Sequence, residues 1–194
     1  ILKLYENPNI VVIDSDSPDK TYFNKIRSSN IEILDVKNKN YDTGAYWIAF
    51  NKFNDFDNYY FLQDSTVIKE NLSSFENNNL TTFRYFLSID KIGGFIYEKP
   101  SNKKLDIIFK LFTKKVKKYP IFGFDNENQL KWSKNELKKT SYFFPKSWVS
   151  VFGPMFICKK IVMEKLKNKN FDKILPNNKL EQMGMERLFG IAFQ

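Results

Sequence analysis

The sequence predicts a mixed α/β fold in which a mainly parallel central sheet is flanked by helices within a single domain. Three observations support this fold class. Residues 10–13 form a β-branched run that is typical of a buried strand, and a second apolar run follows at residues 31–36. A third run, residues 59–62, is rich in aromatic side chains. Because helix-forming segments separate these runs, the strands are expected to pair in parallel, with their carboxyl ends at one edge.

Two helices are expected between these strands. The first follows Asp16 or Ser17, either of which can cap a helix, and Pro18, which suits its first turn; it is expected to end near residue 28. The second covers residues 41–53, where small and aromatic side chains recur along one helical stripe. Small residues on that stripe allow the helix to pack closely against the sheet.

The second half of the chain is less regular. Residues 71–79 are polar and predict a loop, whereas residues 103–118 carry the clearest helical pattern of the chain. Residues 119–148 show no clear period and are interpreted as a long irregular insertion. The remaining expected elements are short strands at residues 81–88 and 93–99, a strand at 149–157, a helix at 160–167 and a C-terminal helix around 180–191.

Length and composition fit one core of ordinary size. The chain has 194 residues, 42% of them hydrophobic, and no composition break divides it into two domains. It starts at Ile1 and stops at Gln194 inside an apolar helical pattern, so the question of a longer parent chain stays open.

The formal net charge of +9 raises nucleic acid or an anionic membrane as a partner. Only three basic residues are arginines, however, so the charge is interpreted as solubility and A/T-rich codon usage, and no specific nucleic acid is expected.

The residue types present restrict the possible chemistry. The chain contains no histidine, which excludes Ser-His and Cys-His nucleophile pairs, imidazole zinc sites and histidine bases. Carboxylates, lysines, tyrosines, hydroxyls or an oxygen-bound metal must therefore carry any reaction. The single cysteine, Cys158, cannot form an internal disulfide, so a reducing, cytoplasmic location and a packed thiol are expected. No apolar run is long enough to predict a membrane span.

The most informative pattern lies at residues 38–66, NKNYDTGAYWIAFNKFNDFDNYYFLQDST. This segment resembles the nucleotide-binding half of family-2-like glycosyltransferases of the GT-A fold, in which a helix with small residues precedes a strand that ends in a short acidic motif. The order of elements over most of the chain fits the same resemblance. It implies a Rossmann-like GT-A fold with one domain over residues 1–194, in which residues 1–100 bind the nucleotide-sugar and residues 101–194 bind the acceptor.

The resemblance implies a hexosyltransferase or related enzyme of polysaccharide biosynthesis. Such an enzyme moves a sugar from a nucleotide-sugar donor, expected to be a UDP-sugar, onto a hydroxyl of a glycan or polysaccharide acceptor. The implied donor-binding residues are Asp14, Ser15, Asp42, Gly44, Tyr46, Gln63, Asp64 and Ser65. Asp42 is equally well placed to cap the helix that begins there.

The acidic motif departs from the Asp-X-Asp pattern that is usual in the family. Gln63 and Ser65 occupy the two acidic positions, and Asp64 between them is the single carboxylate. The resemblance implies Mn²⁺ or Mg²⁺ at Asp64, because a divalent cation bridges the donor diphosphate to the protein. The incomplete motif leaves metal dependence open, and Lys69 is a candidate to share the charge. The alternative interpretation of Asp64 is a turn residue without a ligand.

A catalytic base is expected in the C-terminal half. An inverting transfer needs a carboxylate to take the proton of the acceptor hydroxyl, and the resemblance makes Glu181 and Glu186 the candidates. In a retaining enzyme this role is absent. Trp132 and Trp148 are candidates to stack on acceptor sugars. Positions on a helix surface and burial in the core are the alternative explanations for these glutamates and tryptophans.

Three other functions stay open on sequence grounds. A nucleotidyltransferase, or another nucleotide-binding α/β enzyme, would share the early strands but act on a triphosphate. A non-enzymatic basic module would bind oligonucleotides with a steep salt dependence and would tolerate the change Asp64→Ala. A degenerate transferase would bind the donor without turnover, in keeping with the broken acidic motif.

Overall fold

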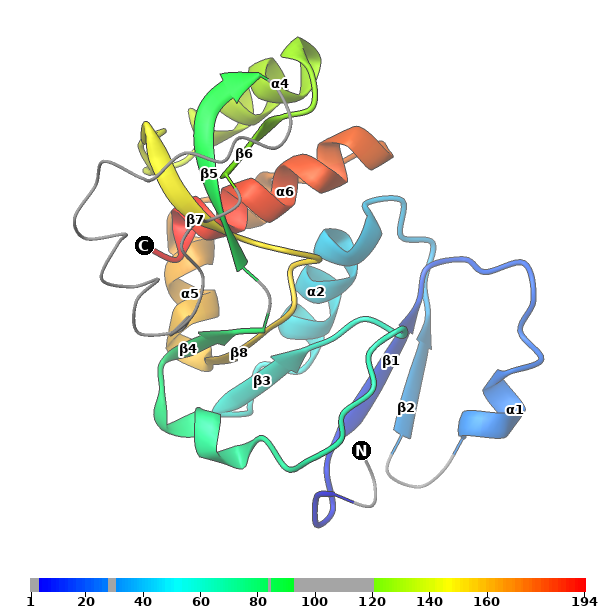
Figure 1. Ribbon diagram of the computed structural model, residues 1–194. Helices are drawn as coiled ribbons and strands as arrows, with labels where there is room; N and C mark the ends of the chain where they lie inside the picture. Colours follow the sequence, from blue (N-terminus) through cyan, green and yellow to red (C-terminus); the bar gives the residue numbers. More distant parts are fainter. Residues whose placement is uncertain (1–3, 28–30, 84, 93–120) are drawn as a thin grey trace.

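The strands of the described chain form three small sheets rather than one continuous central sheet (Figure 1). Helices pack around these sheets and give a mixed α/β domain. The strand expected at residues 93–99 and the helix expected at 103–118 lie outside the described residues. This computed structural model describes residues 4–27, 31–83, 85–92 and 121–194.

The first sheet is parallel, and the other two contain antiparallel pairs. In the first sheet, β1 (Ile10–Asp14) pairs with β2 (Ile31–Asp35). The second sheet joins, in this order and with both pairings antiparallel, β3 (Asn58–Phe61), β8 (Phe156–Lys159) and β4 (Leu80–Thr82). The third sheet joins, in this order, β6 (Ile121–Phe124), β5 (Tyr85–Ile92) and β7 (Ser147–Val151). Its central strand β5 is parallel to β6 and antiparallel to β7.

The expectation of a mainly parallel sheet is therefore wrong. The single strand expected at residues 149–157 is in fact split between β7 and β8, which separate around Gly153, where φ is +58°. After this break, β8 pairs antiparallel with both β3 and β4. An apolar run indicates that a segment is buried, but strand direction depends on how the chain returns to the sheet, and the run does not encode that.

The first helix is much shorter than its pattern predicts. α1 spans only Phe23–Ile26. The residues before it fold around the Asp14 carboxylate, which accepts a hydrogen bond from Ser17 N–H at 3.2 Å. Asp16 has a positive φ of 68°. Both features keep these residues out of the helix that their capping chemistry predicts, because the same polar groups also stabilise turns.

The helix expected at residues 41–53 is confirmed, and it carries the acidic residue Asp42 in its first turn. α2 spans Tyr41–Lys52. Its buried aromatic face packs on the second sheet, where the ring centroids of Tyr46 and Phe61 are 4.8 Å apart. This packing fixes the start of α2 close to the segment that leaves β3.

The expectation of a long irregular insertion at residues 119–148 is also wrong. Besides β6 and the beginning of β7, this segment contains α4 (Glu127–Leu137). Asn126 caps the helix, because its side chain accepts a hydrogen bond from Gln129 N–H at 2.9 Å. The spacing of Asn126 and Gln129 is that of a capping box, so the sequence does contain a signal for this helix start.

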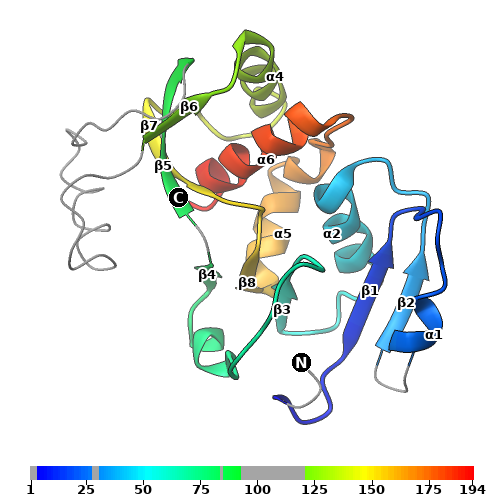
Figure 2. The ribbon, with the colours of Figure 1, turned by 45° about the vertical axis from the view of Figure 1, so that its right-hand side comes forward.

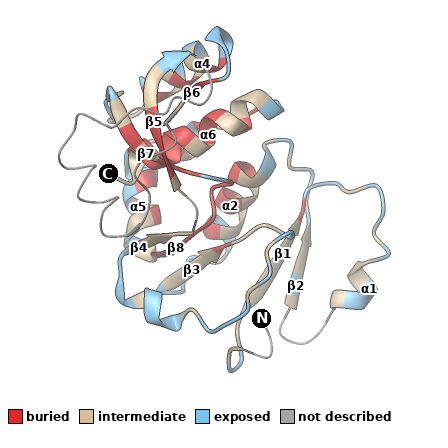
Figure 3. Cartoon of the chain, in the orientation of Figure 1, coloured by how far each residue is buried: buried red, intermediate tan, exposed pale blue. Residues whose placement is uncertain are grey.

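The last two helices confirm their predictions. They are α5 (Lys160–Asn168) and α6 (Lys179–Ala192). Figure 3 shows buried residues concentrated along α6 and the parts of β7, β8 and α2 beside it, so the core lies there. Gly190 allows α6 to approach β7, since a Cβ at this position would lie 2.2 Å from the Val149 carbonyl oxygen. Cys158 is buried in the same core, and burial raises the pKa of its thiol to about 12, which confirms the expected packed thiol.

The arrangement of the sheets is visible in two views. Figures 1 and 2 show β1, β2 and α1 at one side of the molecule, the third sheet and α4 at the other, and β3 and α2 between them. Two short 3₁₀ helices, η1 (Ser73–Asn77) and η2 (Phe171–Lys173), lie in connecting segments. Within the described ranges, none of the helices has the length and apolar character required to cross a membrane.

Candidate functional site

The turn after β3 carries the acidic motif. Thr66 N–H donates to the Gln63 carbonyl at 3.0 Å and closes a turn over Asp64 and Ser65. The Asp64 and Ser65 side chains are exposed, and neither has a hydrogen-bond or ion-pair partner in the part of the chain that the structure describes. The geometry fits both interpretations of Asp64, a carboxylate free to meet a ligand and a solvated turn residue.

Gln63 connects this turn to two other elements. Its Nε2 donates a hydrogen bond to Asp42 Oδ2 at 2.6 Å, in the first turn of α2. On the other side lies Gly153, between β7 and β8, where an added Cβ would come within 3.1 Å of Gln63 Oε1. The left-handed φ of Gly153 and this close contact both favour glycine at that position. The residue that replaces an acid of the usual motif therefore lies where three segments meet.

Glu186 reaches the same place from the C-terminal half of the chain. Its Oε1 accepts a hydrogen bond from Gly153 N–H at 3.1 Å. Burial raises the pKa of Glu186 above its ordinary value, and the Gly153 N–H and the charges of Arg187 and Lys179 oppose this only in part. We refer to four residues of this contact chain as the junction: Asp42, Gln63, Gly153 and Glu186.

The first two turns of α2 add polar groups beside the junction. Tyr46 is buried, and its hydroxyl has no hydrogen-bond partner among the described residues. Burial, with a further contribution from the Asp42 charge, raises the pKa of Tyr46, so the hydroxyl stays protonated and can donate. Thr43 Oγ1 donates to Gln182 Oε1 at 3.2 Å, which ties α2 to α6.

A second polar cluster lies at the carboxyl ends of β1 and β2. Asp14 and Asp35 are register partners, and Lys20 Nζ bonds to both carboxylates, at 2.8 Å to Asp35. Asp14 also accepts hydrogen bonds from Tyr22 OH at 2.5 Å and from Ser17 N–H at 3.2 Å. Burial alone would raise the pKa of Asp14, but these hydrogen bonds, above all that from Lys20, together hold the pKa well below its ordinary value. A ligand of Asp14 would have to displace these donors.

Asn38 contacts Ser15 and Gly44, two further residues that are expected to bind the nucleotide-sugar. Its Nδ2 donates to Ser15 Oγ at 2.9 Å and to the Tyr41 carbonyl at 2.7 Å. A Cβ at Gly44 would lie 2.2 Å from Asn38 Oδ1, so only glycine allows this approach. The segment after β1 therefore lies beside the start of α2. Sequence reasoning missed Asn38, because a single asparagine in a polar loop has no periodic signal.

Glu181 has a capping role in α6. Its Oε2 accepts a hydrogen bond from Asn177 N–H at 2.7 Å, while Asn178 Oδ1 accepts one from Glu181 N–H at 3.0 Å. This reciprocal arrangement satisfies backbone donors at the start of the helix in the manner of a capping box. Glu186 is thus the stronger of the two catalytic candidates.

The two tryptophans differ in exposure. Trp148 is fully buried, and its Nε1 donates to the Arg187 carbonyl at 3.0 Å, so a sugar cannot reach its ring. We leave Trp148 out of the proposed site for this reason. Trp132 is half-buried on α4 and packs against α6, where an added Cβ at Gly184 would lie 2.9 Å from its ring. The exposed part of Trp132 is still available for stacking.

Comparisons with known proteins do not assign the chain to a family. No protein-family model, curated protein or solved structure matches it significantly. Among the described residues, no group of three or more aspartate, glutamate and cysteine side chains is placed to hold a metal ion. Asp64 supplies one free carboxylate, and Mg²⁺ commonly binds through one or two carboxylates together with substrate phosphates and water. A lone carboxylate such as Asp64 fits an ion that is also held by substrate phosphates.

Proposed function

We propose that this chain is a glycosyltransferase of GT-A type, which moves a sugar from a nucleotide-sugar donor, expected to be a UDP-sugar, to a hydroxyl of a glycan or polysaccharide. The junction is the observation that supports this proposal most. It connects Asp42 and the acidic turn, from the expected donor-binding half, to Glu186 from the expected acceptor-binding half. A transfer reaction needs groups for both substrates at one place.

Glu186 is the proposed catalytic base. A carboxylate accepts a proton more readily near neutral pH when its pKa is raised, and burial raises the pKa of Glu186. The Gly153 N–H holds one carboxylate oxygen in place, at 3.1 Å. In the proposed reaction, the carboxylate takes the proton of the acceptor hydroxyl as that oxygen bonds to the donor sugar and the nucleoside diphosphate leaves.

Three groups are proposed to bind the donor near the start of α2. The Asp42 carboxylate accepts hydrogen bonds from ribose or base groups. The Tyr46 hydroxyl is used by no described residue, but it is buried, so its contact with the nucleotide requires the site to open on binding. Asp64 is the proposed ligand of Mn²⁺ or Mg²⁺ on the diphosphate side. When bound, such an ion neutralises charge on the departing diphosphate.

Thermal unfolding with a panel of nucleotides tests this proposal. UDP-glucose, UDP-galactose, UDP-N-acetylglucosamine and GDP-mannose are added separately, with and without Mn²⁺. A donor present at a hundredfold excess over its Kd stabilises the folded protein by about 2.7 kcal/mol, which raises Tm measurably. If none of these nucleotides shifts Tm, the proposal is contradicted.

Three results identify the other candidate functions. A response to ATP or another triphosphate, with none to the nucleotide-sugars, indicates a nucleotidyltransferase or a related enzyme. Tight oligonucleotide binding that weakens steeply with salt and is unaffected by Asp64→Ala indicates a basic binding module. A donor response without sugar transfer or donor hydrolysis indicates a degenerate transferase.

A further inference from the structure

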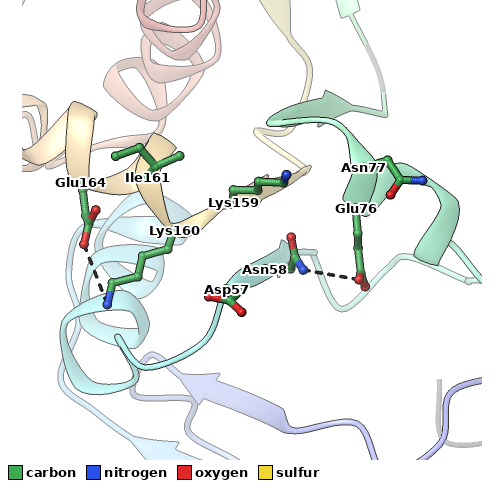
Figure 4. A pocket seen from close by; sticks show the side chains of 8 residues that line it. All are labelled: Asp57, Asn58, Glu76, Asn77, Lys159, Lys160, Ile161 and Glu164. Carbon is green, nitrogen blue, oxygen red and sulfur yellow. Dashed lines mark hydrogen bonds and ion pairs between the residues drawn. The ribbon is translucent and has the colours of Figure 1, made fainter.

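An open polar pocket of about 560 Å³ lies at the end of β3 opposite to the acidic turn (Figure 4). Its walls come from the start of β3, from η1, from the end of β8 and from the first turns of α5. The volume is in the range of pockets that bind small molecules. β3 has four residues, a length of about 13 Å at roughly 3.3 Å per residue, so one small ligand cannot occupy both this pocket and the junction.

Some of the polar groups in the pocket already have partners. The Glu76 carboxylate accepts hydrogen bonds from Tyr60 OH and from Asn58 Nδ2, the latter at 3.3 Å. Lys160 Nζ lies 3.8 Å from the Glu164 carboxylate, one helical turn away. Figure 4 shows the Asn58–Glu76 and Lys160–Glu164 interactions on opposite sides of the pocket.

Other lining groups have no partner in the described parts of the chain. They are the Lys159 ammonium, the Asp57 carboxylate and the Asn77 side-chain amide. The Asn58 Oδ1 atom is buried and also has no hydrogen-bond partner among the described residues. The pocket therefore presents both donors and acceptors that are free to bind a ligand.

The charge of the lining decides between ligand classes. Two lysines and three carboxylates line the pocket, so a phosphate would lie among Asp57, Glu76 and Glu164, and a cation would meet the free Lys159. A neutral ligand with many hydroxyls avoids both costs, because hydroxyls donate to carboxylates and accept from an ammonium or an amide. Ile161, which is 46% exposed, offers an apolar surface for the C–H face of such a ligand.

We infer that this pocket binds a neutral sugar unit of a glycan at a distance from the reacting sugar. That the glycan is the acceptor rests on the proposed function; the sugar binding itself rests on the pocket alone. A glycan held here stays tethered near the junction, which raises its effective concentration at the reaction centre. Asp57 and Lys159 are the side chains that recognise its hydroxyls.

Saturation-transfer NMR with glucose, galactose, N-acetylglucosamine and their linear oligosaccharides tests this inference. At least one of these saccharides is expected to bind the full chain. Asp57→Ala and Lys159→Met are each expected to weaken that binding by roughly tenfold, as the loss of one hydrogen-bonding partner should. Matched controls are Asp55→Ala and Lys165→Met, which change exposed residues outside the pocket and should leave binding unchanged. Unaltered Tm values of all four variants show that folding is intact.

The outcomes separate this inference from the proposed function. Donor-induced stabilisation without saccharide binding, or saccharide binding that both pocket variants leave intact, overturns the inference and keeps the function. Saccharide binding that the pocket variants weaken, without any donor response, supports the pocket and overturns the function. Binding of inorganic phosphate or glycine that these variants abolish shows that the pocket takes a charged ligand and overturns the inference.

Discussion

The Gly153 N–H donates a hydrogen bond of 3.1 Å to Glu186 Oε1, so the turn between β7 and β8 meets α6 at one carboxylate. Gly153 also lies against Gln63, whose amide donates to Asp42 at 2.6 Å. Four segments that are distant in sequence thus converge within a few contacts.

The change Glu186→Gln should abolish most of the sugar transfer and leave donor binding intact. Loss of a general base typically lowers the rate by about 10²–10⁴-fold, whereas the glutamine can still accept the Gly153 hydrogen bond. The ionised carboxylate is the active form, and its pKa is raised. As the pH is lowered, wild-type activity should therefore begin to fall at a higher pH than it would with an ordinary glutamate as the base. A pH series of transfer rates measures this. A variant with wild-type rate and pH profile would show that Glu186 is not the base.

The change Gly153→Ala should reduce both stability and activity. A left-handed backbone costs an ordinary residue about 1–2 kcal/mol, and the new Cβ would meet Gln63 at 3.1 Å and disturb the junction. Urea unfolding and transfer rates are the measurements. Leu137→Ala is the control, since it removes a buried side chain at the end of α4, an element that holds no junction residue, and should cost stability without a specific loss of rate per folded molecule. Equal rate losses in the two variants would contradict a role for Gly153 in the site.

The change Asp14→Asn should destabilise the protein at neutral pH by an amount that shrinks in acid. The folded-state pKa of Asp14 is lowered, so its contribution is present above the ordinary aspartate pKa of about 3.9 and is lost as pH falls toward the lower folded-state value. Urea unfolding of both proteins at pH 7, 5 and 3 should show the difference narrowing only in the most acidic sample. A difference that grows with acidity would contradict the hydrogen-bonded, ionised carboxylate.

The change Trp148→Phe should cost stability and spare sugar binding. Removal of the indole N–H leaves the Arg187 carbonyl without its 3.0 Å partner in the core, at a cost of roughly 1–3 kcal/mol. Denaturant unfolding gives the stability, and saturation-transfer NMR gives the saccharide binding. Loss of saccharide binding by a folded Trp148→Phe protein would restore Trp148 as an acceptor-binding residue.

Local patterns predict local elements of this chain well, and long-range relations poorly. β1, β2, α2, α5 and α6 follow from runs of apolar residues and from helical spacing, because each pattern lies within its own element. The directions of the strands in the second and third sheets do not follow from such patterns, since strand pairing depends on the return path of the chain. α4 was missed because its capping asparagine lies in a segment with few apolar residues.

The candidate site shows the same division. Asp42 was recognisable as a carboxylate at the start of a helix and Glu186 as one on the acidic C-terminal helix, but their connection through Gln63 and Gly153 is a tertiary contact. The Gly-Pro pair within residues 149–157 was the available signal, because glycine and proline interrupt strands. The hydrogen bond from Lys20 to Asp14 likewise depends on how residues 15–22 fold back.

A crystal of this protein soaked with the nucleotide-sugar that raises Tm most, together with Mn²⁺, tests the central claim most directly. We predict density for the nucleoside beside Asp42 and Tyr46, for the diphosphate beside Asp64, and for the sugar toward Glu186. Density for the donor at another place on the molecule, or none at a concentration that saturates the Tm shift, would contradict the junction as the site of sugar transfer.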